Sequence, residues 1–551
     1  MRASVAPLTR AGRTLVERRW YAVGALVLVQ WLVLWHEALH RVQHNGWLYQ
    51  NGDDGPWYWT SAWTLSSLHL PYTSVGPGWP LVLSPFAAIF GPVMTDGLPA
   101  VIALNMLVLA PAAVVGMYLL GERIAGRVFG LWAAALWVVL PVVGVALHRA
   151  THRETIVDFF LPTGRGFNAL SDFPSAVCAI YAGWLVLRAY DSDRLLDGAL
   201  AGLVVGYLVL LKPANGPLAA AAVLLLLVTW RLRALAATCV AAVPAAIALA
   251  IWKKSGTGSV PALSGGGGGG GKKGGGSTPA VVDNAHRYIN IDFHHLAANA
   301  HALREIFWSL RVLEFVLVAG TVGLLLRARW RGAFVVAWFA LFGLIKGSAP
   351  YSNVYDTSLY RFLLPAWPAW VLIVGGVVFC WPTGAAARVR AAAETPARAA
   401  ATVPVRRELV AGAAVLLAAV PLCTIAAASP AAPGKVVDQN YVGSPVAAVD
   451  FGLKDTRTDD HTIRLTWRPR TTHASTTYVV FKAGDQGCVF ATRTLCRFKM
   501  QYIGQTRTPA FVDDQATSHR FYRIGLAIGT RAQRDNPALL LVSTPLEVPA
   551  P

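Results

Sequence analysis

Long apolar runs recur through the first 430 or so residues and limit the fold more than any other feature. A membrane-crossing helix needs about 20 mostly apolar residues. Eleven segments come close to this, at 21–36, 98–119, 128–147, 173–189, 195–212, 216–230, 233–252, 309–327, 332–347, 362–382 and 408–428. Only 14% of the residues are charged, against about 25% in soluble proteins. The sequence therefore predicts a polytopic α-helical membrane protein with about eleven transmembrane helices.

A further apolar stretch, 79–92, is short and bracketed by prolines, and we interpret it as an interfacial helix. Cytoplasmic segments of membrane proteins carry excess Lys and Arg. With eleven crossings the arginine clusters fall on one side, and they include Arg18, Arg19, Arg123, Arg127, Arg188, Arg194, Arg231, Arg233, Arg327, Arg329 and Arg331. We thus predict a multi-pass cell-membrane protein with a cytoplasmic N-terminus and an extracytoplasmic C-terminal region. Because this topology explains most of the net charge of +19, we expect no nucleic-acid partner.

The predicted topology divides the chain into a transmembrane catalytic domain, 1–428, and an extracytoplasmic tail, 429–551. The outside segments of the first domain are 37–97, 148–172 and 253–308, with a short loop at 348–361. The glycine-rich run 265–276 has no preceding strand and no Gly-Lys-Ser/Thr sequence, so it predicts a flexible linker and not a phosphate-binding loop.

The tail alternates polar and apolar residues in the manner of β-strands, at 462–467, 477–481 and 521–524. Its Trp and Tyr positions resemble those of a fibronectin type III-like β-sandwich. Cys488 and Cys496 lie in a polar part of this tail, where an extracytoplasmic location permits oxidation to a disulfide.

An acidic pair, Asp53 and Asp54, follows the first apolar segment, and Tyr58 lies four residues after Asp54. Acidic groups beside a membrane are costly to bury, which makes them candidates for function. The Asp-Gly-Pro sequence is also well suited to a plain turn.

These features, with two later motifs, resemble those of the GT-C superfamily of polyprenyl-phosphate-sugar-dependent membrane glycosyltransferases, including family 39 and arabinofuranosyltransferase-like enzymes. The later motifs are Leu-Ser-Asp-Phe-Pro at 170–174 and Tyr-Arg-Phe-Leu-Leu-Pro at 360–365. The resemblance implies transfer of a monosaccharide from a polyprenyl-phosphate donor to an extracytoplasmic glycan, lipid or protein. The second acidic residue of the family's first loop is often Glu, so which of Asp53 and Asp54 matches the family base stays open.

The reaction requires a base for the acceptor hydroxyl and cations for the leaving phosphate. We predict Asp54 as the base with Asp53 as its partner, and Lys212 and Arg361 as phosphate ligands. Snorkelling of these two cations to the membrane surface is the simpler alternative. The resemblance adds Tyr58, Asp172 and Tyr360 as substrate-binding residues, although Asp172 is also a plausible helix N-cap.

His36-Glu37-Ala38-Leu39-His40 supports a competing function, because it matches the zinc-binding His-Glu-x-x-His motif of metalloproteases. Asp96 would supply a third ligand in such an intramembrane protease. Other histidines cluster at 148–152 and 286–301, so a divalent metal ion as cofactor stays open and no metal ligand is assigned. A transporter is disfavoured, because the apolar segments carry almost no charged residues at their centres.

Overall fold

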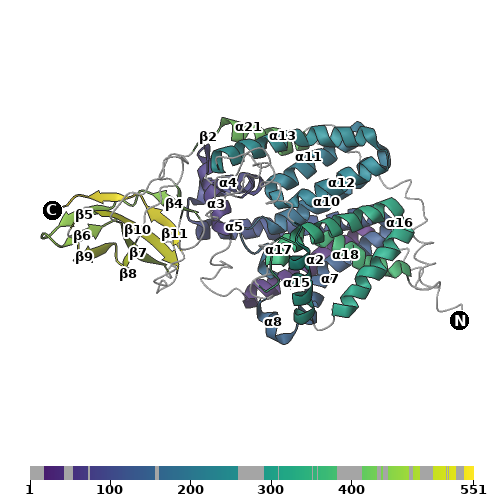
Figure 1. Cartoon of the computed structure of the whole chain (residues 1–551), viewed down its shortest axis with the longest axis horizontal. Helices are drawn as coiled ribbons and strands as arrows, with labels where there is room; N and C mark the ends of the chain where they lie inside the picture. Colours follow the sequence, from purple (N-terminus) through teal and green to yellow (C-terminus); the bar gives the residue numbers. More distant parts are fainter. Residues whose placement is uncertain are drawn as a thin grey trace.

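The molecule consists of a body of helices with a smaller β-sheet region at one end (Figure 1). The computed structural model describes residues 18–41, 54–71, 73, 75–155, 161–257, 291–307, 310–349, 352–355, 358–380, 412–430, 436–438, 445–470, 476–483, 501–516, 518, 520–528 and 539–550. Asp53, the glycine-rich run 265–276 and the predicted Cys488–Cys496 disulfide lie outside these ranges.

The helices form the larger part of the molecule, and α3, α4 and α5 lie at the end that faces the β-sheet region (Figure 1). Their bounds are α2 (Arg19–Arg41), α3 (Gly55–Ser66), α4 (Gly78–Phe90), α5 (Met94–Leu104), α6 (Ala110–Ala125), α7 (Arg127–Leu147), α8 (Ala150–Thr155), α9 (Leu161–Arg165), α10 (Asp172–Ser192), α11 (Leu195–Leu211), α12 (Gly216–Val228), α13 (Leu232–Thr257), α15 (Phe293–Ile306), α16 (Leu310–Gly347), α17 (Ser358–Leu363), α18 (Trp367–Gly376) and α21 (Val420–Ala427). A π-helical turn, Asn105–Leu109, joins α5 to α6.

Six helices in the described ranges are long and apolar enough to cross a membrane: Asp96–Ala125, Arg127–Leu147, Asp172–Ser192, Leu232–Ser255, Leu313–Gly347 and Ser358–Cys380. Five shorter apolar helices accompany them: Arg19–Trp35, Gly78–Phe90, Leu195–Leu211, Pro213–Val228 and Gly412–Ala427. These helices define a multi-pass membrane protein, while its orientation stays a prediction.

Each of the eleven predicted crossings overlaps one of these helices. Two of them, 309–327 and 332–347, share α16, whose backbone turns at Arg329 with φ 37° and ψ −109°. The predicted interfacial segment 79–92 forms the short helix α4. Hydropathy therefore located the helices, and α16 consists of two helical segments that meet at a kink at Arg329.

Small residues let α11 and α13 pack closely, as in many membrane helix pairs. A Cβ atom added at Gly202 would lie 2.2 Å from the backbone oxygen of Thr238. The Thr238 hydroxyl donates to the backbone oxygen of Gly198 at 3.0 Å. This close contact fixes α11, and with it the position of Lys212 directly after its last residue.

The β-sheet region contains two sheets that share one apolar core. Strands β3 (Val436–Asp438), β4 (Pro445–Val449), β7 (Thr476–Ala483), β8 (Gln501–Thr506), β10 (Arg520–Ile528), β11 (Leu539–Ser543) and β12 (Leu546–Val548) form the larger sheet. The smaller sheet contains β5 (Lys454–Arg457), β6 (Ile463–Thr466) and β9 (Ala510–Asp513). The larger sheet is mixed, because β4 pairs with β11 in parallel and the other pairs are antiparallel. The finer likeness to a fibronectin type III sandwich stays a prediction.

The β-sheet region contacts the helical body next to α3 and α5. Val93, which precedes α5, is buried in the apolar core of the β-sheet region. Strand β1 (His69–Leu70), soon after α3, pairs in parallel with β2 (Ser429–Pro430), just after α21. Two separate connections thus hold the tail beside the helix that follows Asp54.

Candidate functional site

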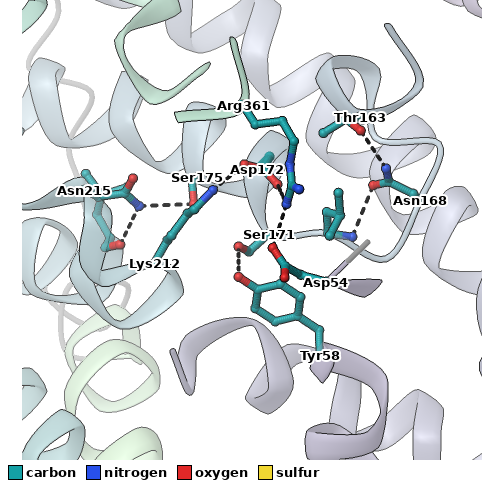
Figure 2. Close-up of polar contacts among 12 residues, drawn as sticks. Asp54, Tyr58, Thr163, Asn168, Ser171, Asp172, Ser175, Lys212, Asn215 and Arg361 are labelled. Atoms are coloured by element: carbon teal, nitrogen blue, oxygen red, sulfur yellow. Dashed lines mark hydrogen bonds and ion pairs between the residues drawn. The ribbon is translucent and has the colours of Figure 1, made fainter. Parts of the chain in front are cut away.

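A chain of four alternating charges lies where α3, α10, α11 and α17 meet (Figure 2). Asp172, the first residue of α10, is buried, with 1% of its side chain exposed. Lys212 Nζ lies 2.6 Å from Asp172 Oδ1, and Arg361 Nη2 lies 3.4 Å from Asp172 Oδ2. A buried carboxylate requires such compensation, because moving it out of water is costly.

Arg361 also contacts the second carboxylate of the site. Its Nη2 lies 2.8 Å from Asp54 Oδ2. Half of the Asp54 side chain is exposed, whereas Asp172 is enclosed. Asp54 immediately precedes α3, and its side chain makes no capping hydrogen bond to that helix. Among the described carboxylates of the site, Asp54 is therefore the one that a substrate can reach.

Two simpler interpretations, Asp172 as a helix N-cap and Lys212 as a snorkelling side chain, do not fit the contacts of these residues. The N-cap of α10 is Ser171 and not Asp172, whose oxygens are engaged by Lys212 and Arg361. Lys212 is 11% exposed and its ammonium also lies 5.0 Å from the centre of the Phe362 ring. A snorkelling lysine would extend its amine to water. Lys212 instead points into the site (Figure 2).

Tyr58 joins α3 to the start of α10. The Ser171 hydroxyl donates a hydrogen bond of 2.6 Å to the Tyr58 hydroxyl, and both residues are buried. Burial raises the pKa of Tyr58 far above its ordinary value, and the negative charges of Asp54 and Asp172 raise it further. Tyr58 therefore stays a neutral phenol that positions the two helix starts.

The loop before α10 is held by side chains from other helices. Asn105, in the π turn, donates to the Gly166 oxygen at 2.8 Å, and Trp79 of α4 donates to the Ala169 oxygen at 2.8 Å. Within the loop, Asn168 donates to the Thr163 hydroxyl at 3.0 Å (Figure 2). These bonds fix the backbone that presents Asp172.

The turn after α11 is fixed in a similar way. Asn215 Nδ2 donates to the Ser175 hydroxyl at 3.1 Å and to the Leu208 oxygen at 2.9 Å (Figure 2). A Cβ atom at Gly78 would lie 2.6 Å from the backbone nitrogen of Leu211, so α4 lies directly against the end of α11. Lys212 is consequently held between α10 and the interfacial helix.

Lys346 is a cation of this region that the sequence analysis missed. It lies near the end of α16, it is 3% exposed, and its charge interacts with that of Lys212. No hydrogen bond or ion pair of its side chain to another described residue is found. A lysine placed after a long apolar helix was the available signal, and nothing in the sequence indicated that it approaches Lys212.

Tyr360 is not part of the charge chain, although it neighbours Arg361. Its ring centre lies 6.2 Å from that of His148, in an edge-on arrangement. It packs beside the apolar cluster formed by Ala302, Ile306 and Leu359. Its assignment as a substrate-binding residue stays a prediction.

Two histidines of the predicted clusters, His148 and His295, contact backbone oxygens in the described ranges. His148 Nδ1 contacts the Gly144 oxygen at 2.7 Å, and His295 Nε2 contacts the Ser352 oxygen at 2.6 Å. Asp292 caps α15 by accepting from two backbone N–H groups. No group of three or more His, Cys, Asp or Glu side chains that could hold a metal is found among the described side chains. The side chains of His36, Glu37 and His40 lie outside them.

Comparison with known proteins gave three representative structural neighbours. The archaeal oligosaccharyltransferase AglB from Archaeoglobus fulgidus, in complex with an inhibitory peptide and a dolichol-phosphate, has a TM-score of 0.38 and 13% identity over 76% of this chain and 57% of that one. The oligosaccharyltransferase of the same organism in the apo form has a TM-score of 0.38 and 16% identity, over 75% and 56%. The arabinosyltransferase EmbB from Mycobacterium smegmatis has a TM-score of 0.35 and 13% identity, over 96% and 65%.

No protein-family model and no curated protein matches the sequence. The chain spans less than two thirds of the length of each of the three structures. It is thus similar in structure, at low sequence identity, to membrane glycosyltransferases. Because all three TM-scores are below 0.4, we base its function on its own residues.

Proposed function

We propose that this chain is an integral membrane glycosyltransferase of the GT-C type. It transfers a monosaccharide from a polyprenyl-phosphate donor to an extracytoplasmic acceptor in the cell envelope, which is a glycan, a lipid or a protein. The observation that supports this most directly is an accessible carboxylate, Asp54, held 2.8 Å from an arginine that belongs to a cluster of partly or fully buried cations. The order of the sequence motifs is the second support.

Asp54 serves as the general base. Its carboxylate is half exposed, so an acceptor hydroxyl can approach it. Arg361 donates to only one of its oxygens in the contacts described above, and a carboxylate has further acceptor positions for a substrate O–H. Asp53, the predicted partner, precedes it directly in the sequence.

Arg361, Lys212 and Lys346 stabilise the leaving phosphate. Among the described side chains, they form with Asp54 and Asp172 a group of three positive and two negative charges, which has a surplus of one positive charge. A sugar linked to a lipid through a phosphodiester carries one negative charge and would neutralise this surplus. Charge complementarity at the point where negative charge develops is usually the largest single contribution to such catalysis.

The reaction is a direct displacement. The acceptor oxygen forms a bond to the anomeric carbon and gives its proton to Asp54. The bond from the anomeric carbon to the phosphate oxygen breaks, and its electron pair leaves with the lipid phosphate near Arg361 and Lys212. Attack from the face opposite the leaving group inverts the anomeric centre.

Among the described residues, Asp54 and Asp172 do not belong to a group of three or more side chains that could hold a divalent metal ion. The oxygens of Asp172 are both engaged by cationic side chains, and Arg361 already contacts Asp54. We therefore assign every step to the protein side chains.

The test is a donor panel with the purified full-length chain in detergent. Release of free polyprenyl phosphate is measured for wild type, Asp54→Asn and Arg361→Gln with several polyprenyl-phosphate sugars. Removal of a general base or of a charge-stabilising donor is expected to lower turnover by at least about 100-fold. Both variants must show the wild-type elution profile in size-exclusion chromatography.

Glu37→Gln distinguishes the competing zinc protease. This variant is expected to release lipid phosphate at the wild-type rate, and addition of a chelator is expected to have no effect. Full activity of Asp54→Asn, together with loss of lipid-phosphate release in Glu37→Gln and on chelation, would contradict the role of Asp54 and assign the reaction to a metal at the His36–His40 segment.

A further inference from the structure

A second group of charged and aromatic side chains lies at the end of α10 opposite Asp172. Asp191 accepts ion pairs from Arg123 of α6 at 2.8 Å and from Arg331 of α16 at 2.8 Å. Because α10 has 21 residues and a helix rises about 1.5 Å per residue, this cluster is about 30 Å from the candidate site. It is therefore independent of the proposed reaction.

Aromatic rings connect further arginines to the cluster. The guanidinium of Arg123 lies 5.8 Å from the centre of the Trp184 ring, and that of Arg188 lies 6.0 Å from it. Arg188 also pairs with Asp197 at 2.7 Å. The cluster thus extends across α6, α10, α11 and α16, and its side chains are partly buried.

Arg231 adds a further positive charge beside the cluster, which already pairs three arginines with two carboxylates. Its guanidinium lies 5.5 Å from the Tyr190 ring, next to Asp191 in the sequence, and no ion pair of Arg231 with a described carboxylate is found. Its Nε atom is buried without a hydrogen-bond partner in the part of the chain that the structure describes. Arg231 thus lies beside Tyr190, whereas Arg123, Arg188 and Arg331 pair with Asp191 and Asp197, and a further carboxylate, that of Asp193, accepts from the Ala234 N–H at 3.1 Å.

Exposed apolar side chains flank Arg231 and the start of α11. Trp230 is 78% exposed, and Leu195, Leu196 and Leu232 are each about half exposed or more. Trp230 has a φ of 57°, a conformation that an aromatic residue rarely adopts, and its turn directs the ring outward. Exposed aromatic and apolar groups beside arginines suit a membrane surface, where acyl chains and charged headgroups meet.

We propose that this cluster is a binding site for the headgroup of an anionic phospholipid. The phosphate contacts Arg231 and the arginines around Trp184, while the acyl chains cover Trp230 and the neighbouring leucines. Basic pockets between transmembrane helices bind anionic lipid headgroups in this way. A free phosphate ion would satisfy the arginines but leave the exposed apolar groups uncovered, so the geometry favours a lipid.

The test is lipid binding by the full-length chain, measured by native mass spectrometry with phosphatidylglycerol, phosphatidylcholine or glycerol 3-phosphate. Wild type is expected to prefer phosphatidylglycerol over the other two. Arg231→Gln is expected to weaken phosphatidylglycerol binding about fivefold, the effect of one cation at a lipid surface, and Arg231→Lys is expected to restore most of it. Arg304→Gln, which removes a paired and exposed arginine elsewhere, is the charge-matched control.

Two results would overturn the proposal. Equal affinity of wild type and Arg231→Gln for phosphatidylglycerol would show that Arg231 does not bind the headgroup. Glycerol 3-phosphate binding as tight as that of phosphatidylglycerol would identify a site for a soluble phosphate and not for a lipid. The experiment measures lipid binding and not catalysis. Its result can therefore be interpreted even if the proposed glycosyltransferase activity is wrong.

Discussion

Asp172 is the residue on which the geometry of the candidate site depends most. It is almost completely enclosed, yet its two oxygens bind cations from two different helices. Replacing a buried ion pair with apolar groups is often neutral, whereas removing one partner leaves an uncompensated charge. The structural and the chemical contributions of this residue can therefore be separated by paired substitutions.

Asp172→Asn is expected to destabilise the protein by about 3–5 kcal/mol, because Lys212 loses its closest counter-charge. The double variant Asp172→Leu/Lys212→Leu is expected to recover much of that loss. Thermal unfolding in detergent of Asp172→Leu, of Lys212→Leu and of the double variant gives the coupling energy. Additive losses in the double variant would show that the pair contributes little.

The ionisation of Asp513 is expected to make the stability of the β-sheet region depend on pH. Burial alone would raise the pKa of Asp513, but hydrogen bonds from Tyr522 and Lys482 outweigh it and hold the pKa below its ordinary value. The contribution of the Asp513 carboxylate to the free energy of unfolding is thus fully present above about pH 4, and it is lost as the pH falls through the lowered pKa.

Asp513→Asn is accordingly expected to be less stable than wild type at pH 7 and to approach wild type near pH 2. Chemical denaturation of the full chain at pH 7, 4 and 2, followed by tryptophan fluorescence, measures this difference. Asp514→Asn, at the next position, is the control. A stability gap that stays constant with pH would contradict the assigned role of the carboxylate.

Sequence patterns singled out several charged residues at the ends of apolar helices that the structure brings together. Asp54, Lys212 and Arg361 were identified because a charge at such a position has a cost, Asp172 was added by the family resemblance, and these four side chains form one chain of contacts. Their pairing was not predictable, since Arg361 and Asp54 are 307 positions apart. Lys346 was missed for the same reason.

Packing between helices decides the position of the site at the level of elements. Helix α11 carries Lys212 at its end, and α11 lies against α13 through glycines that leave no room for a side chain. Hydropathy predicted both helices, but it gives no information on which helices touch. The glycine spacing in α11, at 198, 202 and 206, was the only local sign of a close partner.

Gly202→Ala is expected to destabilise the helical body by about 1–3 kcal/mol, because the added methyl group would meet the Thr238 backbone and helix axes would have to separate. The unfolding temperature in detergent and the fraction of protein in the main size-exclusion peak report the effect. Gly24→Ala in α2 is the matched control, since nothing lies within 4 Å of a Cβ atom there. Equal behaviour of the two variants would contradict the close α11–α13 contact.

The helical body and the β-sheet region are connected at the level of the whole molecule through the segment around α3. Val93 packs in the β core, and β1 pairs with β2 on the other side of the same segment. The sequence predicted the change from helices to strands at about residue 429, but not that the tail would return to the helix following Asp54.

Val93→Asp is expected to loosen this connection, because it places a charge in the apolar core of the β-sheet region. Hydrogen exchange in α3 and in β10 is expected to increase, with little change in α13. Val512→Asp, at an exposed position of β9, provides the comparison. Unchanged exchange in α3 would mean that the tail does not constrain the start of the first outside helix.

The ion pairs of Asp172 also imply competition within the resting protein. Lys212 and Arg361 already hold an anion, the carboxylate of Asp172, at 2.6 and 3.4 Å. Any phosphate that binds there must share these cations with the Asp172 carboxylate or displace it. A weakly bound inorganic ion would not displace the carboxylate, whereas a lipid phosphate with additional contacts along its chain would. In the proposed glycosyltransferase, the Asp172 carboxylate would therefore compete with inorganic anions for these two cations and keep the salts of the surrounding medium from occupying them.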